Sequence, residues 1–152
     1  MKRICIIGLA LVLGATALYA SQEKSTDLSL AQIQADRKAI VSAVVAPAPQ
    51  QEEAFWQTYW EYRGRISRQT DRIVELVKQY EASYAAVDDA VALAMVEEIL
   101  AIQSNWVEIK QEYVRKFQKI LIPKQVVRWY QIENKMDAVY RAEMAVSIPF
   151  DR

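Results

Sequence analysis

The side chains that most often carry out catalysis or bind transition metals are scarce in this sequence. It has no histidine, and its single cysteine, Cys5, and two of its three glycines lie within the first twenty residues. What remains are carboxylates, which occur as adjacent pairs at Glu52-Glu53, Asp88-Asp89 and Glu97-Glu98. Neighbouring residues on a helix point about 100° apart, so such pairs cannot converge on one cation. We therefore expect no metal and no cofactor.

Catalysis has little other support in the sequence. Two carboxylates alone can hydrolyse glycosides, which keeps an enzyme as an alternative. Against it, the sequence contains no glycine-rich phosphate loop, no nucleophile elbow and no cluster of metal ligands. We therefore expect a protein that binds and is not an enzyme.

The start of the chain predicts a secretory signal peptide at residues 1–20. Lys2 and Arg3 precede an uncharged apolar run, and small residues follow it, with cleavage expected after Ala17 or Ala20. The apolar run is too short to span a bilayer comfortably, although a retained N-terminal anchor is the alternative. We expect export to the periplasm and no stable membrane insertion after cleavage.

The mature chain, residues 21–152, is predicted to form a single domain that holds together without disulfides. Removing Lys2 and Arg3 leaves 17 basic residues against 19 acidic ones, a formal charge of −2. This balance provides no basic field for nucleic acid, so we expect no nucleic-acid partner.

Apolar residues recur with helical spacing nearly everywhere, which predicts an all-α fold without a sheet. Pro47 and Pro49 must end a first helix, and Pro123 suits the first position of a last one. We expect the second and third helices to form a long antiparallel hairpin, with the first and fourth packing across it. The predicted helices span about 30–45, 49–86, 89–121 and 123–145.

The long helices carry apolar stripes that predict what they bury. The second helix has one stripe along nearly its whole length, at Phe55, Tyr59, Tyr62, Ile66, Ile73, Val77, Tyr80 and Tyr84. The third has a main stripe from Val91 to Ile120 and a second beside it. That second stripe, which predicts a second buried face, consists of Val96, Leu100, Val107, Val114 and Leu121.

The predicted starts of three helices carry similar residues at the same spacing. Ser29 can accept a hydrogen bond from the backbone of Gln32 while the Gln32 side chain reaches back to Ser29, and Leu28 can pack as a hydrophobic staple. The same spacing returns before the last helix, and a looser copy ends at Gln51. The second copy consists of Leu121, Pro123 and Gln125.

These repeated helix starts resemble the Leu-Thr-x-x-Gln motif of the Spy and CpxP family of periplasmic stress proteins. Ser29 and Ile122 stand where that family has threonine, so the second copy lacks a side-chain cap. The aromatic residues near Phe55 and the segment 129–137 look more like a group of uncharacterised exported proteins related to the family.

The resemblance implies a cradle-shaped helical homodimer. Such a protein would bind unfolded envelope proteins without ATP, or report envelope stress to a sensor. The family's zinc-binding relatives use histidine or cysteine, which the mature chain lacks, so no zinc site is carried over.

One candidate surface for clients lies on the second helix. Trp56 and Trp60 fall beside the core stripe, so either the first or fourth helix covers them or they form an exposed binding surface. Four arginines nearby could attract acidic clients, or they could make ordinary ion pairs. The arginines are Arg63, Arg65, Arg68 and Arg72.

Asn134, Asp137 and Arg141 lie at spacings of three and four on the fourth helix and can share one face. They predict a hydrogen-bond network between helices that fixes the packing register, or alternatively a recognition site for a partner such as a membrane-bound sensor.

The function we expect is that of an ATP-independent chaperone or envelope-stress adaptor. A dedicated accessory or inhibitory subunit for one envelope protein or sensor is the alternative.

Overall fold

The computed structural model of the protein describes residues 28–83 and 88–147. Within these residues the fold is all-α, with no strand, as the sequence predicts. The predicted signal peptide lies outside the described residues. The elements are α1 (Leu30–Val45), the short 3-10 helix η1 (Pro49–Gln51), α2 (Glu52–Ser83), α3 (Asp89–Phe117) and α4 (Pro123–Ser147).

The ends of the long helices differ from the predicted ones in three places. The second helix begins with the 3-10 turn η1 before α2, and α4 continues two residues beyond 145 to Ser147. α3 ends at Phe117 instead of near 121, because the backbone amides of Lys119 and Ile120 bond three residues back. This tighter turn directs Leu121 into the core before α4 starts.

α1 has the predicted bounds but is not straight. Asp36 has non-helical backbone angles (φ −150°, ψ 59°), which divide the helix into two segments. The Asp36 carboxylate then accepts from the backbone amide of Ala39 at 2.8 Å, so it caps the second segment. Ala46 closes that segment in the left-handed region, at φ 48°.

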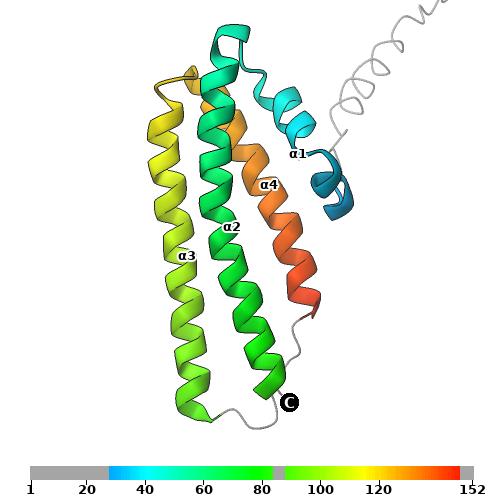
Figure 1. Cartoon of the computed structure of the whole chain (residues 1–152), viewed down its shortest axis with the longest axis vertical. Helices are drawn as coiled ribbons and strands as arrows, with labels where there is room; N and C mark the ends of the chain where they lie inside the picture. Colours follow the sequence, from blue (N-terminus) through cyan, green and yellow to red (C-terminus); the bar gives the residue numbers. More distant parts are fainter. Residues whose placement is uncertain (1–27, 84–87, 148–152) are drawn as a thin grey trace, which may run out of the picture.

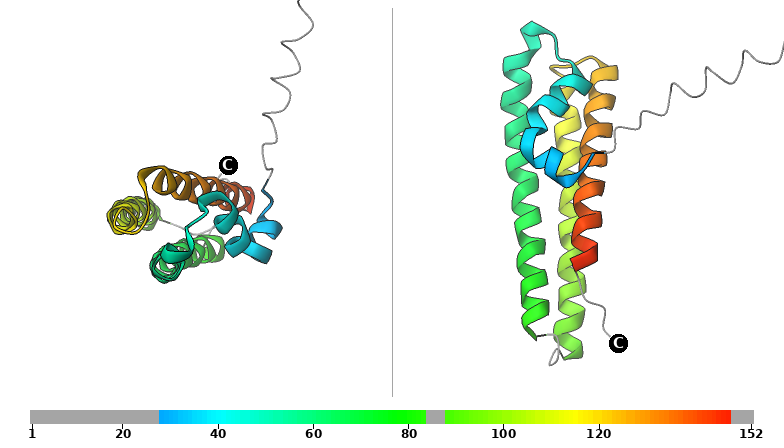
Figure 2. Two further views of the ribbon diagram at one scale, coloured as in Figure 1. Left: turned by 90° about the horizontal axis from the view of Figure 1, so that it is seen from above. Right: turned by 90° about the vertical axis from the view of Figure 1, so that its right-hand side faces the viewer.

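The helices form two pairs. α2 and α3 make the long antiparallel hairpin, and α1 packs against α4 (Figure 1). Figure 2 shows that α4 begins beside the end of α3 and then runs away from it, while α1 lies across the side made by α2 and α4. The end of the hairpin opposite the α3–α4 connection therefore receives little cover.

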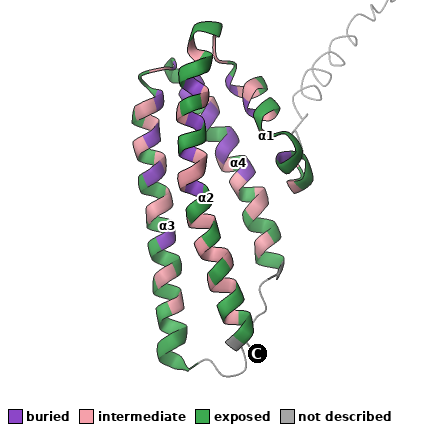
Figure 3. Cartoon of the chain, in the orientation of Figure 1, coloured by how far each residue is buried: buried purple, intermediate pink, exposed green. Residues whose placement is uncertain are grey.

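The core is aromatic and lies at the covered end of the molecule. Phe55 and Phe117 lie 5.4 Å apart between ring centres, and Trp129 of α4 packs 4.4 Å from Phe117. Tyr62 meets the Trp129 ring edge-on at 5.1 Å. In Figure 3 the buried residues gather in this half, and exposed residues dominate the far end of the hairpin.

The predicted burial along the whole hairpin is therefore correct only in part. On α2 the stripe is buried from Phe55 to Ile66, but Ile73, Val77 and Tyr80 are only half-buried, and Tyr84 lies outside the described residues. The predicted second buried face of α3 is wrong for most of its length, because α4 diverges from α3 before reaching it. Its members Val96, Leu100 and Val107 remain 52%, 58% and 55% exposed.

Candidate functional site

Glu133 of α4, which is 1% exposed, has three polar or charged partners among the described residues. Its carboxylate accepts from the Tyr59 hydroxyl at 2.7 Å and pairs with Arg63 at 3.1 Å, both on α2. Arg37, the residue after the α1 kink, reaches the same carboxylate at 3.4 Å. Glu133 therefore joins α1, α2 and α4 at one point, since a buried carboxylate requires such partners.

A second carboxylate extends this cluster toward α3. Asp137 accepts from Lys110 of α3 at 2.8 Å and lies 3.8 Å from Arg63. The same ammonium group donates to Asn134 at 2.7 Å. We call the set Glu133, Asp137, Asn134, Tyr59, Arg37, Arg63 and Lys110 the Glu133 network.

Burial and charge act together on the groups of this network. Burial, followed by the negative charge of Glu133, raises the pKa of Tyr59 and of Tyr62 well above the ordinary tyrosine range. Burial disfavours the charged form of Arg63, but the surrounding charges, Glu133 foremost, outweigh it and raise the pKa of Arg63. The tyrosines thus stay protonated and the arginine stays charged.

The predicted polar ladder on α4 is present in part. Asn134 and Asp137 do bond across helices, which is the packing role predicted for them. Arg141 does not join them: it is exposed and makes no hydrogen bond or ion pair with the described residues. One turn beyond Asp137, it borders a groove.

The sequence placed Glu133 beside the predicted ladder but did not show it as the centre of the network, and it did not show Lys110 and Arg37 as partners. A signal for Glu133 was available, because it interrupts the otherwise apolar buried series of α4 between Trp129 and Met136. A charge at a core-facing position requires a buried partner. No local pattern identifies Lys110 or Arg37, which come from other helices.

The helix-start residues serve the connections between helices. Ser29 and Gln32 form the predicted reciprocal capping box, with Ser29 N to Gln32 Oε1 at 2.9 Å. In the second copy, Leu121 is buried and Gln125 Oε1 accepts from the amide of Ile122 at 3.2 Å.

Two glutamines also link the connections to each other. Gln125 Nε2 donates to the carbonyl of Ala46 at 2.8 Å, and Gln51 Nε2 donates to the carbonyl of Ile120, also at 2.8 Å. Gln125 therefore lies in the first turn of α4 and holds the connection between α1 and α2. Gln51 lies at the start of the η1–α2 segment and holds the connection between α3 and α4.

These two crossed hydrogen bonds correspond to a repeat in the sequence. α4 begins Pro123, Gln125, Trp129, and the η1–α2 segment carries a proline, a glutamine and an aromatic residue at the same spacing. In both, a second aromatic residue and a glutamine follow directly. The matching residues of the first copy are Pro49, Gln51, Phe55, Trp56 and Gln57, and those of the second are Pro123, Gln125, Trp129, Tyr130 and Gln131.

The two candidate tryptophans differ in exposure. Trp56 is half-buried, packs against the core and has the Lys38 ammonium 5.2 Å above its ring. Trp60 is 48% exposed and stacks on Trp56 at 5.8 Å. α1 therefore covers the first tryptophan and leaves the second in solvent.

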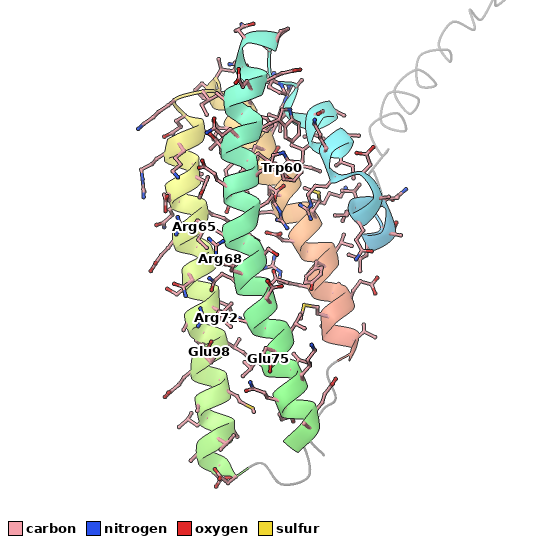
Figure 4. The ribbon with its side chains drawn as sticks, in the orientation of Figure 1. Trp60, Arg65, Arg68, Arg72, Glu75 and Glu98 are labelled. Carbon is pink, nitrogen blue, oxygen red and sulfur yellow. The ribbon has the colours of Figure 1, made fainter. Side chains whose placement is uncertain are left out.

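The four arginines do not form one open cationic patch. Arg63 belongs to the Glu133 network, Arg65 pairs with Glu112 of α3, and Arg72 pairs with Glu98 at 2.6 Å. Among the described residues Arg68 alone of the four makes no hydrogen bond or ion pair. Figure 4 shows Arg65, Arg68 and Arg72 along the α2–α3 side, whereas Trp60 faces α1 and α4. The ordinary ion-pair interpretation fits three of the four.

Trp60 stands at the edge of a groove of about 600 Å³ between α1, α2 and α4. This volume is within the range of sites that hold small molecules or parts of peptides. Its apolar lining includes Leu30, Ile33, Trp60, Ile66, Trp106 and Tyr140, and its charged lining includes Arg37, Lys38, Arg63, Asp71, Asp137 and Arg141. The groove thus joins the exposed tryptophan to the Glu133 network.

No known protein family, curated protein or solved structure matches the chain. Among the described residues, no group of three or more acidic, histidine or cysteine side chains is arranged to hold a metal ion. One described helix, α3, is long and apolar enough to cross a membrane, judged by its length and composition alone. Of the residues in its most apolar stretch, 6% are buried.

Proposed function

We propose that this protein is a non-enzymatic binding protein of the bacterial envelope that holds apolar segments of unfolded polypeptide beside Trp60 without ATP. The observation that carries the proposal is the half exposure of Trp60 at the edge of the 600 Å³ groove. A large aromatic ring left in solvent costs free energy that a bound apolar segment recovers. The helix starts at Ser29 and Gln125, which resemble those of the Spy and CpxP family, give the proposal its cellular setting.

The lining of the groove favours polypeptide segments with both apolar and charged character. Ile33 and Ile66 supply aliphatic surface, and Trp106 adds a second indole. Lys38 and Arg141 lie at the same groove without an ion pair among the described residues, so they are available to a carboxylate, while Asp71 at the same groove is available to a cation. Aromatic surface with a few cations accepts many sequences, which suits a chaperone.

Binding is favoured over catalysis by how the charged groups of the groove are used. Arg63, Arg37 and Asp137 already hold one another or Glu133. Using them in a reaction would require breaking the contacts that join the helices. A groove whose charges stabilise the fold is suited to holding a ligand.

The first test is suppression of aggregation. Wild-type protein at near-equimolar ratio should keep two unrelated, chemically unfolded proteins in solution without ATP, as measured by light scattering. Trp60→Ala should weaken client binding by about tenfold, the effect expected for truncating a central aromatic contact.

Tyr130→Ala is the matched control for the tryptophan. Tyr130 is 44% exposed on α4, similar to Trp60, but it does not line the groove. Its truncation should leave suppression unchanged. If the wild type protects neither client, the chaperone function is wrong; if it protects only one, a dedicated accessory subunit becomes the better explanation.

A further inference from the structure

A second exposed apolar surface lies on α3, away from Trp60. Leu93, Val96, Leu100 and Val107, here called the α3 face, are between 52% and 61% exposed. Their spacings of three, four and seven place them on one side of the helix. Scattered exposed apolar residues are ordinary on a protein surface, but four of them on one side of a helix mark an interaction site, although Gln103 and Ser104 separate Leu100 from Val107.

The charges that α3 itself places beside the α3 face are acidic along most of its length. From Asp88 to Ile109 every charged residue of α3 is acidic, and the first basic residue is Lys110, which is held by α4. Asp89 lies on the same side as the α3 face, and Glu97 and Glu108 follow one of its edges. These three carboxylates are exposed and make no ion pair with the described residues. Glu108 borders a small hollow that Arg65 and Arg68 of α2 also line, so the acidic character of the α3 face is carried mainly by Asp89 and Glu97.

The described part of the chain does not cover this surface. α4 diverges from α3 toward α1, and Figures 1 and 3 show the lower half of α3 facing solvent. An anionic membrane would be repelled by the carboxylates. A second copy that docked through the same face would bring the same carboxylates with it.

We propose that the α3 face docks a basic amphipathic helix of a partner protein, with leucine-like residues against Leu93, Val96, Leu100 and Val107 and lysine or arginine beside Asp89, Glu97 and Glu108. Apolar anchors at three- and four-residue spacing are how one helix recognises another. The carboxylates select the partner's charge and speed its approach. This surface is separate from the groove at Trp60 and does not depend on the proposed chaperone function.

The probe is a fluorescent 18-residue peptide of leucine and lysine with amphipathic helical spacing. Its anisotropy is measured with the full chain at low and at physiological salt. We expect Leu100→Ser to weaken binding by about tenfold, as expected when a central apolar contact is lost. A peptide with glutamate in place of every lysine should bind at least about tenfold more weakly, since like charges oppose it.

Three variants separate the possible explanations. Val127→Ser changes a valine on α4 that is 53% exposed, and it should leave peptide binding unchanged. Trp60→Ala, which removes the groove aromatic, should also leave it unchanged. Glu97→Gln combined with Glu108→Gln should weaken binding and reduce its salt dependence.

Several results would overturn the proposal. Equal binding of the lysine and glutamate peptides, or unchanged binding to Leu100→Ser, would remove its basis. Sedimentation showing a dimer that Leu100→Ser dissociates would assign the surface to a second copy. Binding to phosphatidylcholine–phosphatidylglycerol vesicles that Leu100→Ser abolishes would assign it to a membrane.

Discussion

At the scale of single residues, Glu133 determines how α1, α2 and α4 meet. It accepts from Tyr59 and pairs with Arg37 and Arg63, which come from two other helices. A buried ion pair adds little to the stability of the fold when it is compared with well-packed apolar residues of the same shape. Removing one partner nevertheless costs much, because the other charge stays buried.

We expect Glu133→Gln to lower the free energy of unfolding by about 2–4 kcal/mol, because Arg63 and Arg37 lose their buried counter-charge. Urea unfolding followed by circular dichroism measures this effect. Glu143→Gln on the same helix is the control, since Glu143 is exposed and has no ion pair among the described residues. Equal effects of the two substitutions would show that the network does not hold the helices together.

Tyr62 provides a second prediction at this scale. Its hydroxyl is buried and has no hydrogen-bond partner among the described residues. Tyr62→Phe should therefore raise the free energy of unfolding at neutral pH by about 0.5–2 kcal/mol, since an unpaired buried hydroxyl is costly.

The same substitution should change the stability at alkaline pH. The pKa of Tyr62 is raised in the folded protein, while an unfolded tyrosine ionises near pH 10. Above about pH 10 the folded state therefore binds more protons than the unfolded state. The contribution of this group to the free energy of unfolding is fully present below that pH and decreases above it. Unfolding curves between pH 8 and 11.5 should show a shallower fall for Tyr62→Phe, and an identical or steeper fall would contradict this.

At the scale of elements, the two connections at the covered end fix the order of the helices. Gln51 and Gln125 each close the start of their own helix and donate to the opposite connection. The sequence predicted both as helix-start residues from spacing alone. It could not show the crossed bonds, because their acceptors lie 69 and 79 residues away.

Gln125→Ala should lower the free energy of unfolding by about 1–3 kcal/mol, because the part-buried bonds to the Ala46 carbonyl and from the Ile122 amide are both lost. Thermal unfolding is a sufficient measurement. Gln131→Ala tests an exposed glutamine on the same helix and should have almost no effect. A Gln125→Ala protein as stable as the wild type would show that the crossed bonds are not structural.

At the scale of the whole molecule, burial is uneven. The aromatic core from Phe55 to Ile66 and from Ile109 to Phe117 lies at the end that all four helices share. Toward the other end, α2 and α3 rely mainly on each other and on pairs such as Arg72 with Glu98. Surface ion pairs of this kind contribute little to stability.

Amide hydrogen exchange should therefore follow a gradient along the hairpin. Amides around Tyr59 and Tyr113 should exchange only through global unfolding, whereas those of Val77 and Met95 should be at least about tenfold less protected, because local opening exposes them. Mass spectrometry of peptic fragments resolves these segments. Uniform protection along α2 and α3 would show that the open end is as stable as the core.

The sequence alone determined the helices and most of their ends, since prolines, caps and apolar spacing act within a few residues of one another. It also identified Trp60, Asn134 and Asp137 as candidates, because each departs from the pattern of its own helix. The tertiary structure decided which helix sides are covered: Trp56 is shielded and Trp60 exposed, three arginines are paired, and the second stripe of α3 stays in solvent. A stripe shows which residues share a face, but α4 leaves α3 open because it diverges toward α1, and that direction depends on contacts far apart in the chain.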